Sequence, residues 1–211
     1  MNLRKTLMTL TALLAGAFVT LASAAETNLV AGEHYEITAP KGSDEPMMEE
    51  FFNYACGACY GIEKFMGDFK KNNPGIKVKL VPLELNPAWK IYVKAYYIGE
   101  KLNVLEKSHS KLFHRLHVEK KAFKGEDDMK AFFLSLGVEE KAYDDVAKSF
   151  WLATQVRKSK QYAMKHRVMS TPTLLVNQRF KLNNRNIGDY TKIEQAAITL
   201  SGVASQSVAA Q

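Results

Sequence analysis

The sequence contains very little cysteine: two residues, Cys56 and Cys59, in a chain of 211. A disulfide between them would close a small ring, for which loop-closure entropy predicts a stabilisation of roughly 2 kcal/mol, against roughly 4 to 5 for a ring of about a hundred residues. A structural zinc site needs four ligands, and the sequence has no second C-x-x-C motif. The scarcity of cysteine therefore argues against a disulfide scaffold and a zinc domain, whereas a redox pair needs only these two sulfurs.

Long apolar runs are also absent after the N-terminal segment, so nothing else approaches the ~20 residues that a membrane span needs. Arg4 and Lys5 precede an uncharged, largely apolar segment at 7–21, and Ala22-Ser23-Ala24 has the small-x-small cleavage pattern. We expect residues 1–24 to be a signal peptide that is cleaved after Ala24. An uncleaved anchor is the alternative, but the apolar segment is short for a span. Export is therefore predicted, and the short basic start indicates the bacterial periplasm.

The chain lacks a strong charge excess. The predicted leader holds two basic residues and no acidic ones, so its removal lowers the formal net charge from +7 to +5. The lysines are scattered along the sequence, and an exported protein does not meet nucleic acid. We therefore expect a solvated basic surface and no nucleic-acid partner.

Hydrophobic periodicity predicts a strand–helix–strand unit at 47–54, 57–72 and 76–81, and this order favours a right-handed parallel connection. About eighty residues without a convincing strand follow, with helical periodicity in four segments. These segments are 89–102, 104–118, 126–136 and 139–167, of which the last is long enough to bend or split. A short strand at 34–38 precedes the unit, and strands at 173–176 and 179–182 and a helix from 189 to about 200 end the chain.

The fold class that fits this order is α/β, with a core divided by an inserted all-helical domain. We predict the two parts of the core at 25–86 and 168–201 and the helical insertion at 87–167. Residues 202–211 are small and polar and are expected to form a flexible tail.

The cysteine pair falls where the second predicted strand ends and the first helix begins. Unpaired backbone N–H groups and the helix dipole at that place stabilise a thiolate, which is the reactive form of cysteine. Cys59 lies one turn further along the helix, on its apolar face. We therefore expect Cys56 to be the exposed thiol that meets the substrate and Cys59 to be the shielded resolving partner. A structural bridge or a metal site is the alternative.

Glu50 is expected to lie beneath the sulfurs. Along a strand, Glu50, Phe52, Tyr54 and Cys56 share one face. A carboxyl group in a central strand is costly unless it is paired or protonated, so its pKa should rise and the group could store a proton near the sulfurs. The alternative is that Glu50, like its neighbour Glu49, faces solvent on an edge.

Two further features carry weaker signals. Thr171-Pro172 precedes a predicted strand, and X-Pro bonds can be cis in tight turns, although the trans isomer is the common one. His109, His114 and His117 occur in one predicted helix, where no carboxylate or cysteine nearby completes a metal site. We expect these histidines to form a solvated face.

With these motifs assembled, the chain resembles the DsbA family of periplasmic thiol:disulfide oxidoreductases. The resemblance rests on Glu50-Phe51-Phe52 leading to Cys56-x-x-Cys59-Tyr60, and on Thr171-Pro172 followed by Leu175-Val176-Asn177. It implies a thioredoxin-like fold with a helical insertion over essentially the whole mature chain. It also implies a Cys56–Cys59 disulfide, with Cys56 as the nucleophile, Cys59 as its buried partner and Glu50 as the buried acid.

The resemblance further implies a cis Pro172 facing the disulfide, with backbone groups of Thr171 binding an extended substrate peptide by strand addition. One departure concerns the two residues between the cysteines, where the family often has Pro-His and this chain has Gly57-Ala58. Because Ala58 offers neither charge nor hydrogen bond, the Cys56 thiolate should be less favoured and the disulfide less oxidising. Gly57 and Ala58 are thus expected to modulate the potential, while the helix terminus keeps some acidity.

The function expected from the sequence is oxidation of exported proteins that carry free cysteines, by exchange through Cys56 and Cys59. The resemblance implies reoxidation by a DsbB-type, quinone-linked membrane partner, with no bound cofactor and no metal. No added dimerisation region is visible, which favours a monomer. A reductase or isomerase of the same fold is the nearest alternative, and a peptide-binding chaperone or copper-handling module is an alternative of another class.

Overall fold

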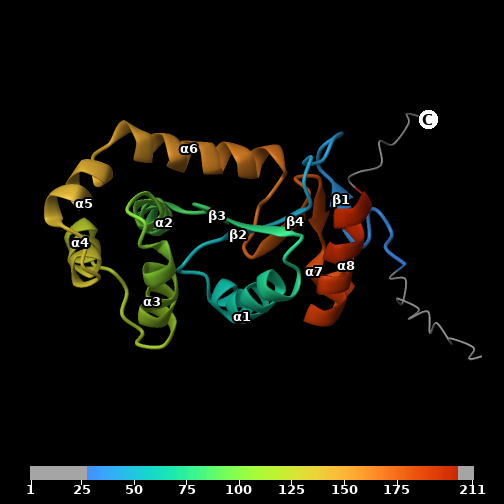
Figure 1. Ribbon diagram of the computed structural model, residues 1–211, viewed down its shortest axis with the longest axis horizontal. Helices are drawn as coiled ribbons and strands as arrows, with labels where there is room; N and C mark the ends of the chain where they lie inside the picture. The colour runs from blue at the N-terminus through green and yellow to red at the C-terminus, as the bar shows by residue number, and fades with distance from the viewer. Residues whose placement is uncertain (1–27, 204–211) are drawn as a thin grey trace, which may run out of the picture.

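The computed structural model describes residues 28–203, coloured from blue to red along the chain in Figure 1. The predicted signal peptide and almost all of the predicted tail lie outside the described residues. The elements are β1 (Tyr35–Ile37), β2 (Met47–Phe52), α1 (Gly57–Asn72), β3 (Lys77–Pro82), η1 (Pro87–Trp89), α2 (Lys90–Lys101), α3 (Leu105–His117), α4 (Glu126–Ser135), α5 (Glu140–Ala147), α6 (Phe150–Lys165), β4 (Thr173–Val176), β5 (Phe180–Leu182), α7 (Asn184–Ile187) and α8 (Tyr190–Val203).

The strands form one mixed sheet of five strands in the order β1-β5-β4-β2-β3. β2 pairs in parallel with β3, as the strand–helix–strand order predicted, and antiparallel with β4. β2 is therefore a central strand, and all six of its residues are buried. β3 pairs with β2 alone and forms one edge of the sheet.

Helices cover both faces of this sheet. α6 lies above it in Figure 1, and α1 lies below it. Alternate residues of β2 point to these two sides: the Phe51 ring stacks on Tyr162 of α6 at a centroid distance of 5.6 Å, whereas Met48 packs in a cluster with Ile62 and Phe65 of α1. The alternation follows from the two-residue period of a strand, and it gives neighbouring residues of β2 different surroundings.

The predicted helix at 139–167 is two helices. α5 ends at Ala147, and the Ser149 side chain caps α6 by accepting a hydrogen bond from the Leu152 N–H at 3.1 Å. At the C-terminal end, α8 continues to Val203, beyond the predicted end near Leu200, and the short helix α7 was not predicted.

Five helices, α2 to α6, lie between β3 and β4 in the sequence. Their buried side chains, among them Tyr96, Phe113 and Phe133, form one apolar cluster with residues from the end of β2 and the start of α1. That cluster includes both Cys56 and Cys59. The cysteine pair therefore lies where the helical segment meets the sheet.

Candidate functional site

Cys56 is the N-cap residue of α1, directly after the turn that follows β2. The Cys56 N–H donates to the Asn53 carbonyl at 3.0 Å, which closes that turn. The Cys56 Sγ accepts a hydrogen bond from the Cys59 N–H at 3.3 Å. The first free N–H groups of the helix thus point at the sulfur, which is the arrangement that stabilises a thiolate.

The two cysteines, which are free thiols in this structure, differ in access. Cys56 is 9% exposed and Cys59 is 1% exposed. The expected order of access is confirmed, but the prediction of an exposed Cys56 is wrong in degree, because the helical segment packs against this end of α1. Only the edge of the Cys56 side chain reaches the surface.

Hydrogen bonding separates the acidities of the two thiols. The Cys59 thiol donates to the Cys56 sulfur, and this is the main reason why the pKa of Cys56 falls from its ordinary 9.0 to about 5. Burial of the sulfur opposes the effect, and hydrogen bonds from Thr171 and from the backbone N–H groups of Cys59 and Ala58 add to it. The same bond, with burial, raises the pKa of Cys59 far above its usual range. At neutral pH, Cys56 is therefore the ionised sulfur and Cys59 keeps its proton.

The segment before β4 faces the cysteine pair. The Thr171–Pro172 peptide bond is cis, and the Cys56 thiol lies 3.6 Å from the Thr171 carbonyl oxygen, to which it can donate. Residues 115 positions apart in the sequence are thus brought together at the Cys56 sulfur. The C-x-x-C motif and the Thr-Pro motif belong to one site.

Glu50 lies in the central strand and is 4% exposed. Burial is the main cause that raises the pKa of Glu50 to about 8, and the negative charges of Cys56 and Glu63 raise it further. The burial of Glu50 and the raised pKa predicted from the strand pattern are confirmed. The alternative, in which Glu50 and Glu49 both face solvent, is wrong because β2 is central: Glu49 is fully buried and bonded to Lys79 and Tyr162.

The histidines of α3 do not form the expected solvated face, and sequence reasoning missed their contacts. His109 is half-buried and bonds the Tyr54 hydroxyl through Nδ1 at 2.8 Å, while burial lowers the pKa of His109 to about 4. His117 Nε2 donates to the Tyr54 carbonyl oxygen at 2.7 Å. Only His114 is exposed. The helical segment therefore holds the turn that leads into Cys56.

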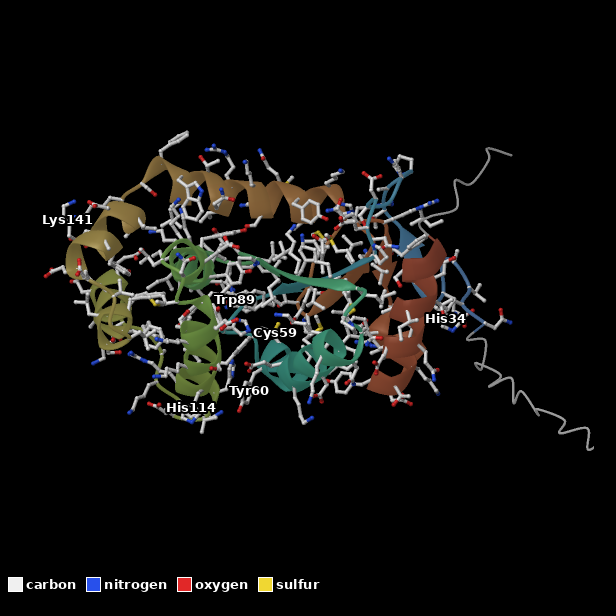
Figure 2. All side chains as sticks on the ribbon, viewed as in Figure 1. His34, Cys59, Tyr60, Trp89, His114 and Lys141 are labelled. Carbon is white, nitrogen blue, oxygen red and sulfur yellow. The ribbon has the colours of Figure 1, made fainter. Side chains whose placement is uncertain are left out.

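Gly57 and Ala58 are exposed at the start of α1. A Cβ atom on Gly57 would lie 4.0 Å from His117 Cε1, so an imidazole from α3 flanks the position next to Cys56. The ring of His117 also stacks on Tyr60 at 5.1 Å between centroids. Figure 2 shows Cys59 and Tyr60 near the place where α1 approaches α3. The spacing of the histidines alone gave no signal for this contact.

Two absences concern residues 28–203. Within this range, no three histidine, cysteine, aspartate or glutamate side chains gather closely enough to hold a metal ion. Nor does any helix in the same range combine the length and the apolar character that crossing a membrane requires.

Comparison with known proteins gives a consistent result. The profile of the DSBA-like thioredoxin domain family matches residues 89–193. The chain is 33% identical over 156 residues to the thiol:disulfide interchange protein DsbA of Bordetella parapertussis, with 71% of this chain and 73% of that protein covered. It is 26% identical to DsbA of Pseudomonas aeruginosa, with 85% of this chain and 87% of that protein covered.

Solved structures agree on the fold. The crystal structure of Pseudomonas aeruginosa DsbA superposes with a TM-score of 0.75 at 22% identity, covering 82% of this chain and 93% of that one. The oxidoreductase DsbA of Xylella fastidiosa superposes with a TM-score of 0.73 at 21% identity, covering 82% and 96%. The fold is thioredoxin-like, with a mixed sheet and several helices, as expected.

Proposed function

The chain belongs to the DsbA family and is a disulfide oxidoreductase, and from that premise we propose that it oxidises exported proteins by thiol–disulfide exchange through Cys56 and Cys59. The observation that carries the direction is the pKa of about 5 for Cys56. A stable thiolate favours the dithiol form, so the disulfide form accepts electrons readily. The Ala58 side chain cannot lower the pKa of Cys56, but hydrogen bonds from Cys59, Thr171 and the backbone N–H groups do.

The exchange proceeds in two displacements. A substrate thiolate attacks Cys56 Sγ of the Cys56–Cys59 disulfide, forming a mixed disulfide and releasing the Cys59 sulfur, which takes up a proton. A second substrate thiolate attacks the substrate sulfur of the mixed disulfide and releases the Cys56 thiolate. The substrate loses two electrons and the enzyme gains them, so no bound cofactor is required. The low pKa of Cys56 makes it the better leaving group in the second step.

Glu50 and the Thr171–Pro172 segment take supporting roles in this proposal. Protonated Glu50, whose pKa is raised to about 8 mainly by burial, stores a proton beside the sulfurs. Thr171 lies before strand β4 and next to Cys56, where its backbone groups could pair with an extended substrate segment. Gly57 and Ala58 leave the approach to Cys56 unobstructed, since Gly57 has no side chain, Ala58 has a small one, and both residues lie at the surface.

The proposal places the protein in the periplasm. The leader predicted for residues 1–24 and the family membership support export to the periplasm, where free cysteines of newly exported proteins are the substrates. Reoxidation would come from a DsbB-type membrane partner, and the enzyme would act as a monomer.

Trapping tests the proposed roles of the two sulfurs. Cys59→Ser cannot form the Cys56–Cys59 disulfide, so its Cys56 thiolate attacks a disulfide of an exported protein, displaces one substrate sulfur as a thiolate and forms a mixed disulfide. We expect this mixed disulfide to accumulate, because no second enzyme thiol remains to break it. The experiment is non-reducing electrophoresis of periplasmic extracts, with Cys56→Ser as the matched control. Trapping by Cys56→Ser and none by Cys59→Ser would reverse the assignment.

The reduction potential of the pair, measured by equilibration with glutathione, tests the direction. A potential at the oxidising end of the range for this fold supports the oxidase, and one near that of thioredoxin would make the protein a reductase. Chaperone activity that survives replacement of both cysteines by serine, without any exchange activity, would instead support the binding-protein alternative.

A further inference from the structure

We propose that this protein has a second peptide-binding site, a groove along the open edge of β3 that takes an extended acidic segment by strand addition. This groove is distinct from the Thr171–Pro172 surface, because neither of those residues lines it. The proposal stands on the shape, the open strand edge and the charges of the groove, and it does not depend on the direction of the redox reaction.

The groove is large enough for a peptide. Its volume is about 1010 Å³, and β3 contributes five consecutive residues to its lining, from Lys77 to Val81. α1 forms one wall and α6 another, with Tyr96 of α2 and Phe113 of α3 toward the helical segment. In Figure 1, β3 lies between α6 above and α1 below. A bound segment would therefore lie against a strand, between two helices.

Half of the backbone groups of β3 are available for pairing. The N–H groups of Lys77 and Leu83 donate toward the β2 side, to the carbonyls of Pro46 and Phe52 at 3.0 and 2.8 Å. Successive peptide groups of a strand point to opposite sides, so the N–H groups of Val78 and Leu80 point to the open edge. Strand addition uses such free groups, and side-chain pockets on either side then give specificity.

The walls of the groove carry unpaired positive charge. Four of its lysines are exposed and form no ion pair within residues 28–203. They are Lys70 of α1, Lys77 of β3, and Lys158 and Lys165 of α6. Since they come from both walls and from the strand between them, an occupant would meet positive charge from three sides.

The four unpaired lysines outnumber the three carboxyl groups of the lining, Glu50, Glu63 and Glu100. Burial raises the pKa of Glu50 to about 8, so this group is mostly protonated at neutral pH. Burial also raises the pKa values of Glu63 and Glu100 above their ordinary range. The fifth lysine, Lys79, is bound to Glu49 outside the groove. An acidic segment is therefore the occupant whose charge fits.

Lysines on an edge strand also have a simpler explanation, since they discourage pairing between sheets. That explanation covers Lys77 and Lys79, which lie on β3 itself. It does not cover Lys70, Lys158 and Lys165, which lie on the helices that face the edge. Positive charge on the facing walls repels a basic strand and attracts an acidic one, so it selects among charged occupants.

The groove reaches the buried side of the redox site, because Cys59 and Glu50 line it. A segment bound there would lie behind the disulfide while Cys56 remains free on the other side. An acidic part of a substrate or partner could thus be held while its cysteine reacts at Cys56. Binding at β3 and exchange at Cys56 should be separable by substitution.

The probe for this test is a capped decapeptide of alternating glutamate and valine. We expect its binding to the full mature chain to shift the amide resonances of Val78 and Leu80 in NMR spectra. The double variant Lys158→Glu/Lys165→Glu should raise the dissociation constant by at least about tenfold. The double variant Lys107→Glu/Lys111→Glu should change it by less than about twofold. Lys107 and Lys111 are the matched control, since they are exposed, lie on α3 and do not line the groove.

Four further measurements define the outcome. The same peptide with every second amide methylated should lose binding, since it cannot pair with the strand edge. Exchange with glutathione should stay within about twofold of the unsubstituted protein in both lysine variants, because neither touches the sulfurs. Equal binding of a lysine–valine decapeptide, resonance shifts confined to Thr171 and its neighbours, or binding of octanoate with none of the acidic peptide would overturn the proposal.

Discussion

The two faces of the sheet give two neighbouring carboxyl groups different surroundings. Glu49 and Glu50 are consecutive residues of β2, and both are buried. On the α6 side, Glu49 accepts hydrogen bonds from Lys79, at 2.9 Å, and from the Tyr162 hydroxyl. On the α1 side, Glu50 has no basic partner within residues 28–203, and burial raises its pKa to about 8.

The difference shows that one strand gives two neighbouring carboxyl groups different environments. A buried carboxyl group that accepts hydrogen bonds from a lysine and a tyrosine joins its strand to the neighbouring strand and to a helix. A buried carboxyl without a cation holds its proton at neutral pH and can release it when the charge nearby changes. Because neighbouring residues of a strand face opposite sides, the two roles differ by one position in the sequence.

The largest expected effect concerns Glu50 and pH. Because its folded-state pKa of about 8 lies above the ordinary 4.5, the stability that Glu50 contributes is present below pH 4.5 and is lost as pH rises through 8. Glu50→Gln removes this loss, so the reduced variant should gain up to about 4 kcal/mol over the reduced unsubstituted protein between pH 4.5 and pH 9.

Urea unfolding of both reduced proteins at a series of pH values measures this gain. Glu49→Gln is the matched control: it changes the neighbouring carboxyl in the same way but weakens the contacts with Lys79 and Tyr162, so at pH 7 it should lower the free energy of unfolding rather than raise it. A stability difference between Glu50→Gln and the unsubstituted protein that stays constant with pH would contradict the comparison.

Glu49→Gln should cost stability directly. The substitution removes the charge that pairs with Lys79, whose side chain is 45% exposed and can turn toward water, while Tyr162 can still donate to the amide oxygen. We therefore expect a loss of about 1–3 kcal/mol in the free energy of unfolding, at the lower end for buried ion pairs. The urea midpoint at pH 7 measures it, and an unchanged pKa of Cys56 in the variant should accompany it. A loss below about 0.5 kcal/mol would show that Glu49 has no structural role.

A smaller effect, on the pKa of Cys56, is expected where α3 contacts the turn before Cys56. His117→Ala removes the donor to the Tyr54 carbonyl and the ring stacked on Tyr60. Loosening this turn weakens the hydrogen bonds that favour the thiolate, so the pKa of Cys56 should rise by less than about one unit, or about 1 kcal/mol.

Thiolate absorbance measures that shift. His117→Asn, which keeps an N–H donor, should recover part of it, and His114→Ala is the matched control because His114 is exposed on the same helix. A drop in stability for His117→Ala with no change in the pKa of Cys56 would assign His117 a structural role only.

Much of this site follows from sequence periodicity and motif placement. The start of α1 at Gly57 and the burial of Cys59 follow from the strand end and the apolar spacing of the helix. The burial of Glu49 and the contacts of His109 and His117 do not, because they depend on partners supplied by α6 and on the turn at Tyr54. Local patterns identify which residues share a face, but the packing of distant helices decides what that face meets.

At neutral pH, Cys56 is the ionised sulfur of the pair and Cys59 keeps its proton. Alkylation of the reduced protein by iodoacetamide over a range of pH, followed by peptide mass analysis, measures both groups separately. We expect modification at Cys56 with a midpoint near pH 5, the value set chiefly by the hydrogen bond from Cys59, and no modification of Cys59 in the same range. A midpoint near the ordinary value of 9.0, or earlier alkylation of Cys59, would contradict it.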